Sequence, residues 1–417
     1  MSDQTFDITH WCGIPPAYLH RPDGTLDEDR FVQMKDAGLN LIFPYDHGVQ
    51  TNREILALCH RLGLRVTLSD HRLHEAQADA TRRHALLRAV VDDYADCPAL
   101  HGYYLADEPH KNDFPALSET VAILRKLDPH HESYVNLFAN YVPNTLLGYD
   151  SYEAYLEHFV AEVNPPILSY DHYHFLTGEP LPCVSIPNER ERLIFESAYR
   201  QEGRPGFFDN LEDARAAADR EGIPFMVIVL LTAHGPCRDL TEAEIRFEVY
   251  QSLAYGASSL SYFTYWTPGT EWDERDIWHW RSGMIDATGH PTHHYDMVAR
   301  VNRELQSIGN ALITQKSLGV FHAGACPDTK TTPWPGAFGD LASIEATALT
   351  VGCFTDGYVL LANQDYQSPQ VATLTVHGQK QLLHYQKQSE SWTPLTAVDG
   401  CYRIPLGAGD GELLRLL

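Results

Sequence analysis

The sequence predicts an α/β protein: a (β/α)8 TIM barrel followed by a small all-β sandwich domain. Two observations lead to this fold class. Through the first three quarters of the chain, short apolar runs alternate with segments of helical period, eight times in succession. After residue 317, alternating apolar and polar runs separated by turn residues replace the helical segments. Parallel strands buried on both faces produce the first pattern, and antiparallel strands of a sandwich produce the second.

Each expected strand is a run of apolar, β-branched and aromatic residues that stops at polar residues. The fourth run, LHGYYLADEPH, ends on two adjacent acids, Asp107 and Glu108. The seventh, IPFMVIVLLTAHG, contains no acid. The eight barrel strands are expected near residues 6–14, 38–46, 64–70, 100–110, 132–141, 165–175, 223–235 and 258–268.

Start and stop signals mark the helices between these strands. Thr25 and Glu28 form a T-x-x-E capping box before FVQMKDAG, and Thr241 and Glu244 repeat it before FEVYQSLAYG. The helix THHYDMVARVNRELQSIG closes the barrel. We therefore place the barrel at residues 1–312 and the β-sandwich at residues 313–417, with a proline-containing excursion at 326–340.

Charge and composition disfavour some classes of binding partner. The formal net charge is −25, which disfavours nucleic acid and anionic membranes because no basic stripe is present to neutralise phosphates. No run approaches the roughly 18 apolar residues of a membrane span. The first residues, MSDQTFDITHW, do not resemble a signal peptide, and the eight cysteines are scattered without a CxxC pair. A cytoplasmic protein is therefore expected, and its oligomeric state, including homo-oligomerisation, is left open.

No cofactor is expected. The sequence has no GxGxxG or Walker loop for a nucleotide, no GxSxG nucleophile elbow and no HExxH metal motif. Several histidines fall near strand ends, including His10, His47, His71 and His234. We interpret them as hydrogen-bond partners rather than metal ligands, because they lack ligand spacing.

The carboxyl ends of the expected strands are unusually polar, and in a (β/α)8 barrel these ends meet at one face. Six of the eight ends carry Asp, Glu or His. One such acid is commonly a surface residue or a helix cap, but six at one face predict a shared cavity. The polar candidates for ligand contact are Asp46, Asp70, Asp107, Asn140, His234 and, in the loop after the eighth strand, Glu271.

Aromatic residues share these strand ends. Acids hydrogen-bond hydroxyl groups and flat rings stack on C–H faces, so the combination predicts a neutral carbohydrate as the ligand. Tyr104 and Phe263 are expected to be core residues instead. The aromatic candidates for ligand contact are Trp11, Tyr45, Tyr173, Tyr265 and Trp266, followed by Trp272, Trp278 and Trp280 in the last loop, each of these three equally compatible with the core.

The stretch GYYLADEP resembles the fourth-strand signature of clan A (β/α)8 glycoside hydrolases, where Asn-Glu-Pro or Asp-Glu-Pro ends the strand. AYGASSLSYFTYWTP and MIDATGHPTHHYDMVARVNRELQSIG resemble the end of β-galactosidase-like barrels, which commonly carry a C-terminal sandwich. The resemblance covers nearly the whole chain. It implies a hydrolase of carbohydrate metabolism with Glu108 as general acid/base, since a departing glycosidic oxygen needs a proton. Asp107 and a partly apolar pocket are expected to raise the pKa of Glu108.

The chain departs from the clan A pattern at strand seven, where those enzymes place the nucleophilic Glu and this sequence has Thr232 and His234. Three interpretations follow. Asp171 or Glu271 replaces the nucleophile; the enzyme is inverting, with Asp46, Asp70 or Asp171 as base; or the barrel binds sugars without cleaving them. We favour Asp171 because a strand end fixes a side chain better than a loop. A metal-dependent barrel hydrolase or isomerase is a further alternative.

Overall fold

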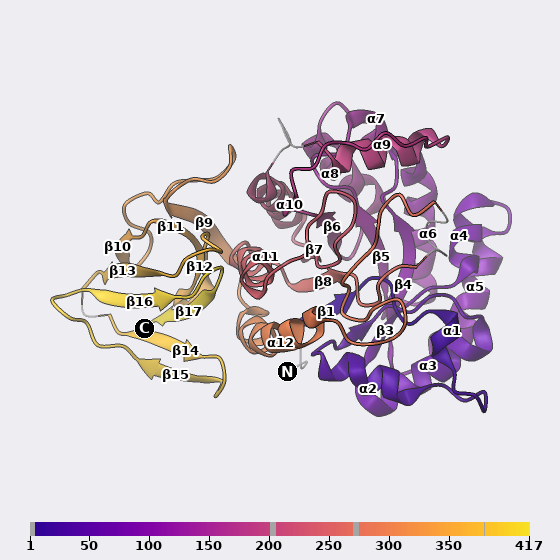
Figure 1. The fold of residues 1–417 in the computed structure, drawn as a ribbon, viewed down its shortest axis with the longest axis horizontal. Coiled ribbons are helices and arrows are strands. Elements are labelled where there is room, and N and C mark those ends of the chain that lie inside the picture. Colours follow the sequence, from indigo (N-terminus) through magenta and orange to yellow (C-terminus); the bar gives the residue numbers. More distant parts are fainter. Residues whose placement is uncertain (1–4, 201–205, 270–274, 379) are drawn as a thin grey trace.

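Eight parallel strands form the barrel in the computed structural model, which describes residues 5–200, 206–269, 275–378 and 380–417. They are hydrogen-bonded in the order β1-β8-β7-β6-β5-β4-β3-β2, and the Asn40 N–H, just before β2, donates to the Ile8 carbonyl of β1 (Figure 1). The predicted fold class is confirmed. The strands are β1 (Asp7–His10), β2 (Leu41–Ile42), β3 (Arg65–Leu68), β4 (Leu100–Asp107), β5 (Glu132–Leu137), β6 (Leu168–His172), β7 (Phe225–Leu230) and β8 (Ser259–Phe263).

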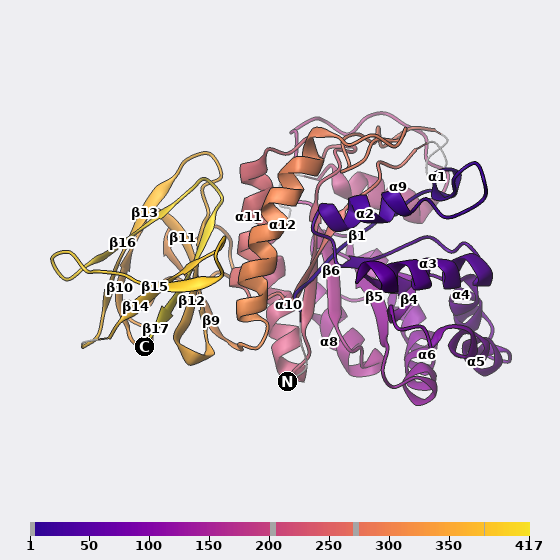
Figure 2. The same cartoon turned by 90° about the horizontal axis from the view of Figure 1, so that it is seen from below.

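Helices cover the outside of the barrel, and α11 and α12 lie on the side that faces the sandwich (Figure 2). Within the described residues, none of the helices is both long enough and apolar enough to cross a lipid bilayer. The helices are α1 (Pro16–Leu19), α2 (Glu28–Asp36), α3 (Val49–Leu62), α4 (His71–Ala78), α5 (Arg83–Tyr94), η1 (Lys111–Asp113), α6 (Phe114–Leu127), α7 (Asn144–Leu147), α8 (Tyr152–Val163), α9 (Glu189–Ala198), α10 (Phe207–Glu221), α11 (Glu242–Ala254), α12 (His293–Leu312) and η2 (Thr355–Gly357).

The apolar character of the strands matches their burial. All six residues of β7 are buried, as expected for a parallel strand covered on both faces. Inside the barrel, Trp11, Tyr134 and Met226 form an aromatic and aliphatic cluster against which Tyr104 and Phe263 pack. The expectation that both residues belong to the core is confirmed in that both pack against this cluster, although both are only partly buried and Phe263 also borders the barrel mouth.

One of the two predicted capping boxes forms. The Thr241 hydroxyl accepts from the Glu244 N–H, and the Glu244 carboxylate accepts from the Thr241 N–H, at the start of α11. The box at Thr25 and Glu28 was a wrong prediction, because α2 begins after Asp27 and Thr25 instead bonds the carboxylate of Asp23. A local Asp-x-Thr turn thus competes successfully with the capping box.

The sandwich packs a six-stranded sheet, β15-β14-β17-β12-β11-β9, against a three-stranded sheet, β10-β13-β16. All neighbouring strands are antiparallel, and Leu349, Leu361, Leu374 and Leu414 fill the space between the sheets. The expected excursion joins β9 to β10. The strands are β9 (Ser317–Gly324), β10 (Leu341–Glu345), β11 (Ala348–Phe354), β12 (Tyr358–Asn363), β13 (Gln370–Val376), β14 (Leu382–Gln386), β15 (Ser391–Pro394), β16 (Tyr402–Leu406) and β17 (Gly411–Leu416).

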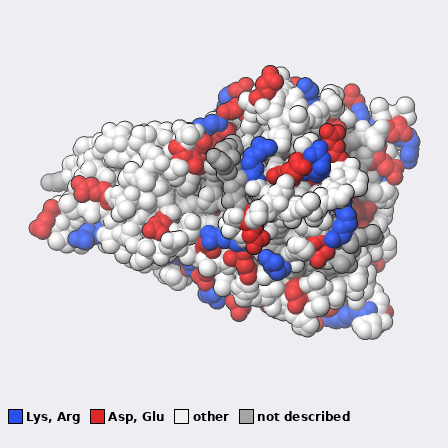
Figure 3. All heavy atoms as spheres, turned by 45° about the horizontal axis from the view of Figure 1, so that its top comes forward, with Lys and Arg blue, Asp and Glu red and all other residues white. Residues whose placement is uncertain are grey.

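A charged seam, formed by Arg246, Glu304, Lys387, Asp410 and Glu412, joins the sandwich to the barrel helices. Arg246 of α11 lies 2.9 Å from Glu304 of α12 and 3.3 Å from Asp410 of the sandwich. Lys387 is buried and lies 3.0 Å from Asp410, 3.2 Å from Glu412 and 3.3 Å from Glu304. Elsewhere, on the face shown in Figure 3, acidic and basic side chains are interspersed over the broad barrel lobe and sparse on the narrower sandwich lobe.

Candidate active site

An irregularity in β4 presents two adjacent acids at the mouth of the barrel. The pairing of β4 with β5 shifts register between Tyr104 and Ala106, so Asp107 comes to lie opposite Asn136. Glu108 follows with a φ of 49°, while its N–H still donates to the Asn136 carbonyl. A left-handed conformation is unfavourable for a residue with a side chain, by about 1 kcal/mol, and such positions cluster at functional sites.

The amide of Asn136 connects two carboxylates from neighbouring strands. Its Nδ2 donates to Asp107 Oδ1 at 3.0 Å and to Asp171 Oδ1, at the end of β6, at 3.1 Å. The Ser169 hydroxyl donates to Asn136 Oδ1, which fixes the orientation of the amide. The Tyr134 hydroxyl in turn lies 3.1 Å from Ser169 Oγ. One hydrogen-bonded chain therefore positions Asp107 and Asp171 beside each other.

Asp107, Glu108 and Asp171 form what we call the acid cluster, and each of the three has a raised pKa. Burial raises the pKa of Glu108 well above its usual range, and the neighbouring charges of Asp171 and Asp107 raise it further. Burial and the charge of Asp107 raise the pKa of Asp171 to about 7, against the hydrogen bonds from Asn136 and Tyr173. Desolvation raises the pKa of Asp107 to about 6, which is a smaller rise than that of Asp171, because part of the Asp107 side chain remains exposed. The cluster therefore retains protons near neutral pH.

A cavity of about 410 Å³ opens beside the acid cluster, within the usual size range of small-molecule sites. Asp107 and Glu108 line it, together with His74 and Gln77 from α4 and Arg190 from α9. Arg190 Nη2 donates to the Glu108 carbonyl at 2.9 Å but lies 3.9 Å from its carboxylate. The Glu108 side chain is 19% exposed, so solvent reaches it. The carboxyl group of Glu108, the predicted general acid/base, thus borders the cavity, and its ion pair with Arg190 is long.

The other half of the mouth, at the ends of β7 and β8, is aromatic. His234 stacks on Trp280 with ring centroids 4.6 Å apart, and it meets Tyr173 edge-on at 5.4 Å. Tyr173 also packs against Phe263, at 5.1 Å. The pKa of His234 is lowered to about 4 by burial, so this ring is neutral. Flat faces and a neutral imidazole beside carboxyl groups suit a polyhydroxylated ring.

Of the remaining acidic and amide candidates, those described have other partners. Both oxygens of Asp70 are bound by Arg72, and Asp70 Oδ2 also accepts from Tyr94, so the residue caps α4 and holds its helix in place. Asp46 accepts from Gly48, Asn52 and His71, and its pKa is lowered. The Asn140 side chain donates to the Gly206 carbonyl. Glu271 and Trp272 lie outside the described residues.

Among the aromatic candidates, the structure separates core from mouth. Trp266 is buried, packs against Tyr18 at 4.9 Å and lies under the guanidinium of Arg30. Trp11 meets Tyr104 edge-on inside the barrel, and Tyr265 is buried beside His10. Tyr45 is partly exposed next to His47. The aromatic half of the mouth is therefore Tyr173 with His234, Phe263, Trp278 and Trp280.

A larger cavity, of about 1060 Å³, opens at the opposite, N-terminal ends of the strands. Four of its charged or titratable lining residues pair with one another: Arg65 with Asp7, and His101 with Glu132 at 3.2 Å. Catalytic residues of (β/α)8 enzymes lie at the other face, where the acid cluster is. We therefore assign the candidate site to the smaller cavity.

The sequence candidates did not include several residues of the site, among them His74, Gln77, Asn136 and Arg190. Asn136 is a lone amide in the apolar run ESYVNLF, and that isolation in a buried strand is a usable signal. Arg190 comes from α9, in the long segment after β6, and nothing in NERERL marks it. Its position depends on how that segment folds back over Phe138.

Solved structures similar to this chain include glycoside hydrolases. A glycoside hydrolase family 5 protein from Bacteroides vulgatus ATCC 8482 matches with a TM-score of 0.54 and 12% identity, over 99% of this chain and 89% of that one. Another glycoside hydrolase matches with a TM-score of 0.52 and 12% identity, over 100% and 96%. The β-galactosidase from Marinomonas ef1 matches with a TM-score of 0.49 and 11% identity over 73% of this chain, which spans 60% of that enzyme.

No family model and no curated protein matches the sequence. The similarity to solved structures shows the fold, a TIM barrel followed by a β-sandwich of the kind found in glycoside hydrolases.

Proposed function

We propose that this chain is a glycoside hydrolase that cleaves O-glycosidic bonds of a neutral oligosaccharide or glycoside. The observation that carries the proposal is the acid cluster: Glu108 lines a ligand-sized cavity and its pKa is raised, with Asp171 and Asp107 close by. Hydrolysis of a glycoside requires one carboxylic acid and one carboxylate at the same bond. Three neighbouring acids that resist full ionisation supply both forms at once.

In this proposal Glu108 donates the proton to the departing glycosidic oxygen and then, as carboxylate, takes a proton from the incoming water. Asp171 is the second carboxylate: it attacks the anomeric carbon as the glycosidic C–O bond breaks, and it leaves as the carboxylate when the water displaces it. Asn136 and Tyr173 hydrogen-bond its charged form, which favours ionisation against the effect of burial. Asp107, held by the same Asn136 amide, keeps the pKa of both neighbours high. Tyr173 and Trp280, which are partly exposed at the mouth but do not line the cavity, then support the sugar beyond it, with buried His234 behind them.

Replacement of Glu108 by Gln tests the assignment. With an alkyl glycoside, whose leaving group needs a proton, we expect turnover to fall by about 10²–10⁴-fold. A dinitrophenyl leaving group departs as the anion and needs no proton. With a dinitrophenyl glycoside, the rate of glycosidic-bond cleavage should therefore fall much less. Glu75→Gln, on an exposed acid of α4, is the matched control and should keep full activity. Unchanged turnover of both substrates by Glu108→Gln would remove Glu108 from the mechanism.

Carbohydrate binding without cleavage is the competing function, and the absence of an acid at the end of β7 favours it. The described residues there are Thr232 and His234. A panel of aryl glycosides of common neutral sugars separates the two functions. Thermal stabilisation by a sugar without turnover of any glycoside in the panel would favour the binding function.

A further inference from the structure

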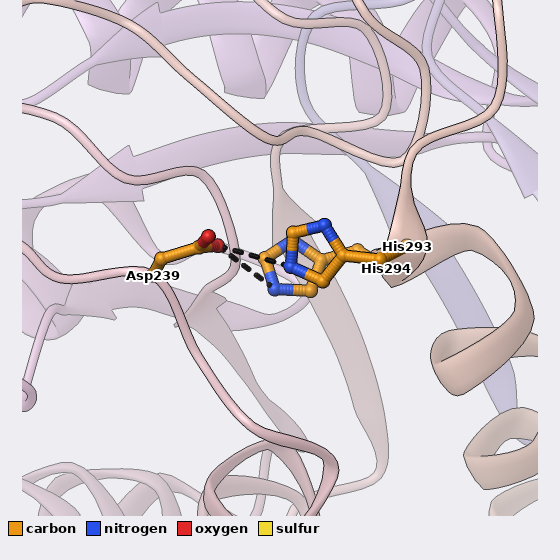
Figure 4. Close-up of side chains that lie close together, drawn as sticks. All are labelled: Asp239, His293 and His294. Carbon is orange, nitrogen blue, oxygen red and sulfur yellow. Dashed lines mark ion pairs between the residues drawn. The ribbon is translucent and has the colours of Figure 1, made fainter.

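Three side chains from two distant segments converge away from the acid cluster. Asp239 lies in the loop between β7 and α11, and His293 and His294 are the first residues of α12. Asp239 Oδ1 lies 3.3 Å from His293 Nε2 and 3.3 Å from His294 Nε2 (Figure 4). All three atoms lie within 4.8 Å of one another. Figure 4 shows both imidazoles turned toward the same carboxylate.

Backbone carbonyl oxygens face both ring nitrogens of His294. Its ring is fully buried; Nδ1 lies 2.5 Å from the Ser282 carbonyl, and Nε2 lies 3.0 Å from the Leu240 carbonyl. A neutral imidazole has only one N–H, so it can satisfy only one of these two oxygens. The shorter contact places that N–H on Nδ1. The Nε2 lone pair then faces the Leu240 oxygen and the Asp239 carboxylate, an arrangement that repels unless a cation lies between them.

We propose that His294 Nε2, His293 Nε2 and Asp239 Oδ1 bind a divalent transition-metal ion, with Zn²⁺ the best match. Tetrahedral zinc with bonds of roughly 2.0–2.2 Å places neighbouring ligand atoms about 3.4 Å apart, close to both separations observed. Zinc-bound histidines usually donate their second ring N–H to a carbonyl, as His294 does to Ser282. Two imidazoles and a carboxylate are ligands that zinc accepts, and His293 and Asp239 are half-exposed, which leaves the site open to solvent.

A metal here would hold together two loops of the barrel mouth. Asp239 follows His234 in the β7–α11 loop, whereas Ser282 and α12 follow Trp278 and Trp280. The site would therefore fix the aromatic half of the mouth without contacting the acid cluster. The second group of potential ligands, Asp46, Asp70 and His71, is a poorer site because Arg72 already binds both oxygens of Asp70.

Titration of the full-length, metal-stripped protein with Zn²⁺ tests the proposal. Calorimetry should show a site that weakens at least about tenfold in His293→Ala and in Asp239→Ala. Binding should also raise the melting temperature, because an ion that binds only the folded state stabilises it. His290→Ala, an exposed histidine of the same loop, and His71→Ala are controls and should bind as the wild type does. His294 itself is kept, because it is buried.

Co²⁺ provides a second readout that does not depend on enzyme activity. A four-coordinate site should give visible absorption that Zn²⁺ removes and that is absent in His293→Ala. Failure of the wild type to bind Zn²⁺ would overturn the proposal, and so would binding that survives in both variants.

Discussion

The seam and the acid cluster are two groups of acidic side chains whose surroundings shift the pKa values in opposite directions. In the seam, burial disfavours ionisation of Glu304, but the hydrogen bond from Arg246 and the charge of Lys387 outweigh it and lower its pKa to about 2. In the acid cluster the facing cation is Arg190, which is half-exposed and 3.9 Å from Glu108. Burial and mutual repulsion therefore prevail there, and all three pKa values rise.

The difference separates acids that stabilise the fold from acids that are available for chemistry. A buried carboxylate with charged partners is costly to disturb, because removal of one partner leaves a desolvated charge. Carboxyl groups that repel one another in a cavity hold protons near neutral pH, which is typical of catalytic sites. Their repulsion also lowers the stability of the folded state, so substitutions in the two regions should change stability in opposite directions.

Asp171→Asn should have the largest effect. If Asp171 is the second carboxylate, turnover should fall roughly 10³-fold or more for activated and unactivated glycosides alike, unlike Glu108→Gln. The unfolding midpoint in urea should stay the same or rise, since one repelling acid is removed. Steady-state kinetics and urea titration measure the two effects. Asp92→Asn, on an exposed acid of α5, is the control; full activity of Asp171→Asn would exclude this residue and point to Asp107.

Lys387→Met tests the seam and should lower the free energy of unfolding by about 3 kcal/mol. The substitution keeps most of the apolar volume but leaves Glu304, Asp410 and Glu412 short of one cation. Turnover should be unaffected while the protein is folded. Lys380→Met removes an exposed lysine from its pair with Asp340 and should change stability by less than about 0.5 kcal/mol. Equal effects of the two substitutions would show that the seam does not stabilise the fold more than a surface ion pair.

Asp107→Asn should shift the pH dependence of the proposed reaction. Asp171 must be ionised to act, and its pKa is raised by burial and by the charge of Asp107. Loss of that charge lowers the pKa of Asp171, so the acidic limb of kcat/KM should move to lower pH by roughly one unit. Glu75→Gln should leave the limb in place. An upward shift, or no shift, would mean that Asp107 and Asp171 do not titrate against each other.

The same shifts give the pH dependence of stability an opposite sign in the two regions. The folded pKa of Glu304 is depressed, so its contribution is present above its unfolded pKa and is lost as the pH falls toward about 2. The folded pKa of Asp171 is raised to about 7, so its protonated form contributes stability below its unfolded pKa, and that contribution is lost as the pH rises through the folded pKa. Acidification should therefore weaken the ion pairs of the seam, whereas it should remove the charge repulsion within the acid cluster.

The sequence predicted the barrel because its strands are buried on both faces and read as apolar runs. It placed Glu108 and Asp171 at strand ends for the same reason. Asp70 shows the same pattern, yet Arg72, two residues later, binds both of its carboxylate oxygens and makes it a structural residue. Trp266 could not be separated from the mouth aromatics, because its partners Tyr18 and Arg30 are far away in the chain. The register shift in β4, which brings Asp107 to Asn136, has no signature in the residues that form it.

Arg190→Met should give the smallest effect, because Arg190 is the weakly paired cation of the acid cluster. Arg190 is the cation that opposes the rise in the pKa of Glu108. Its removal should raise that pKa further and move the alkaline limb of kcat/KM to higher pH, by less than about half a unit because the guanidinium is solvent-screened.

Arg190→Lys keeps the charge, so its limb should coincide with that of the wild type even though the bond to the Glu108 carbonyl changes. If both variants instead raise KM strongly while the limb stays in place, Arg190 acts by binding the substrate in the cavity, and the proton on Glu108 is held by the other two acids and by burial alone.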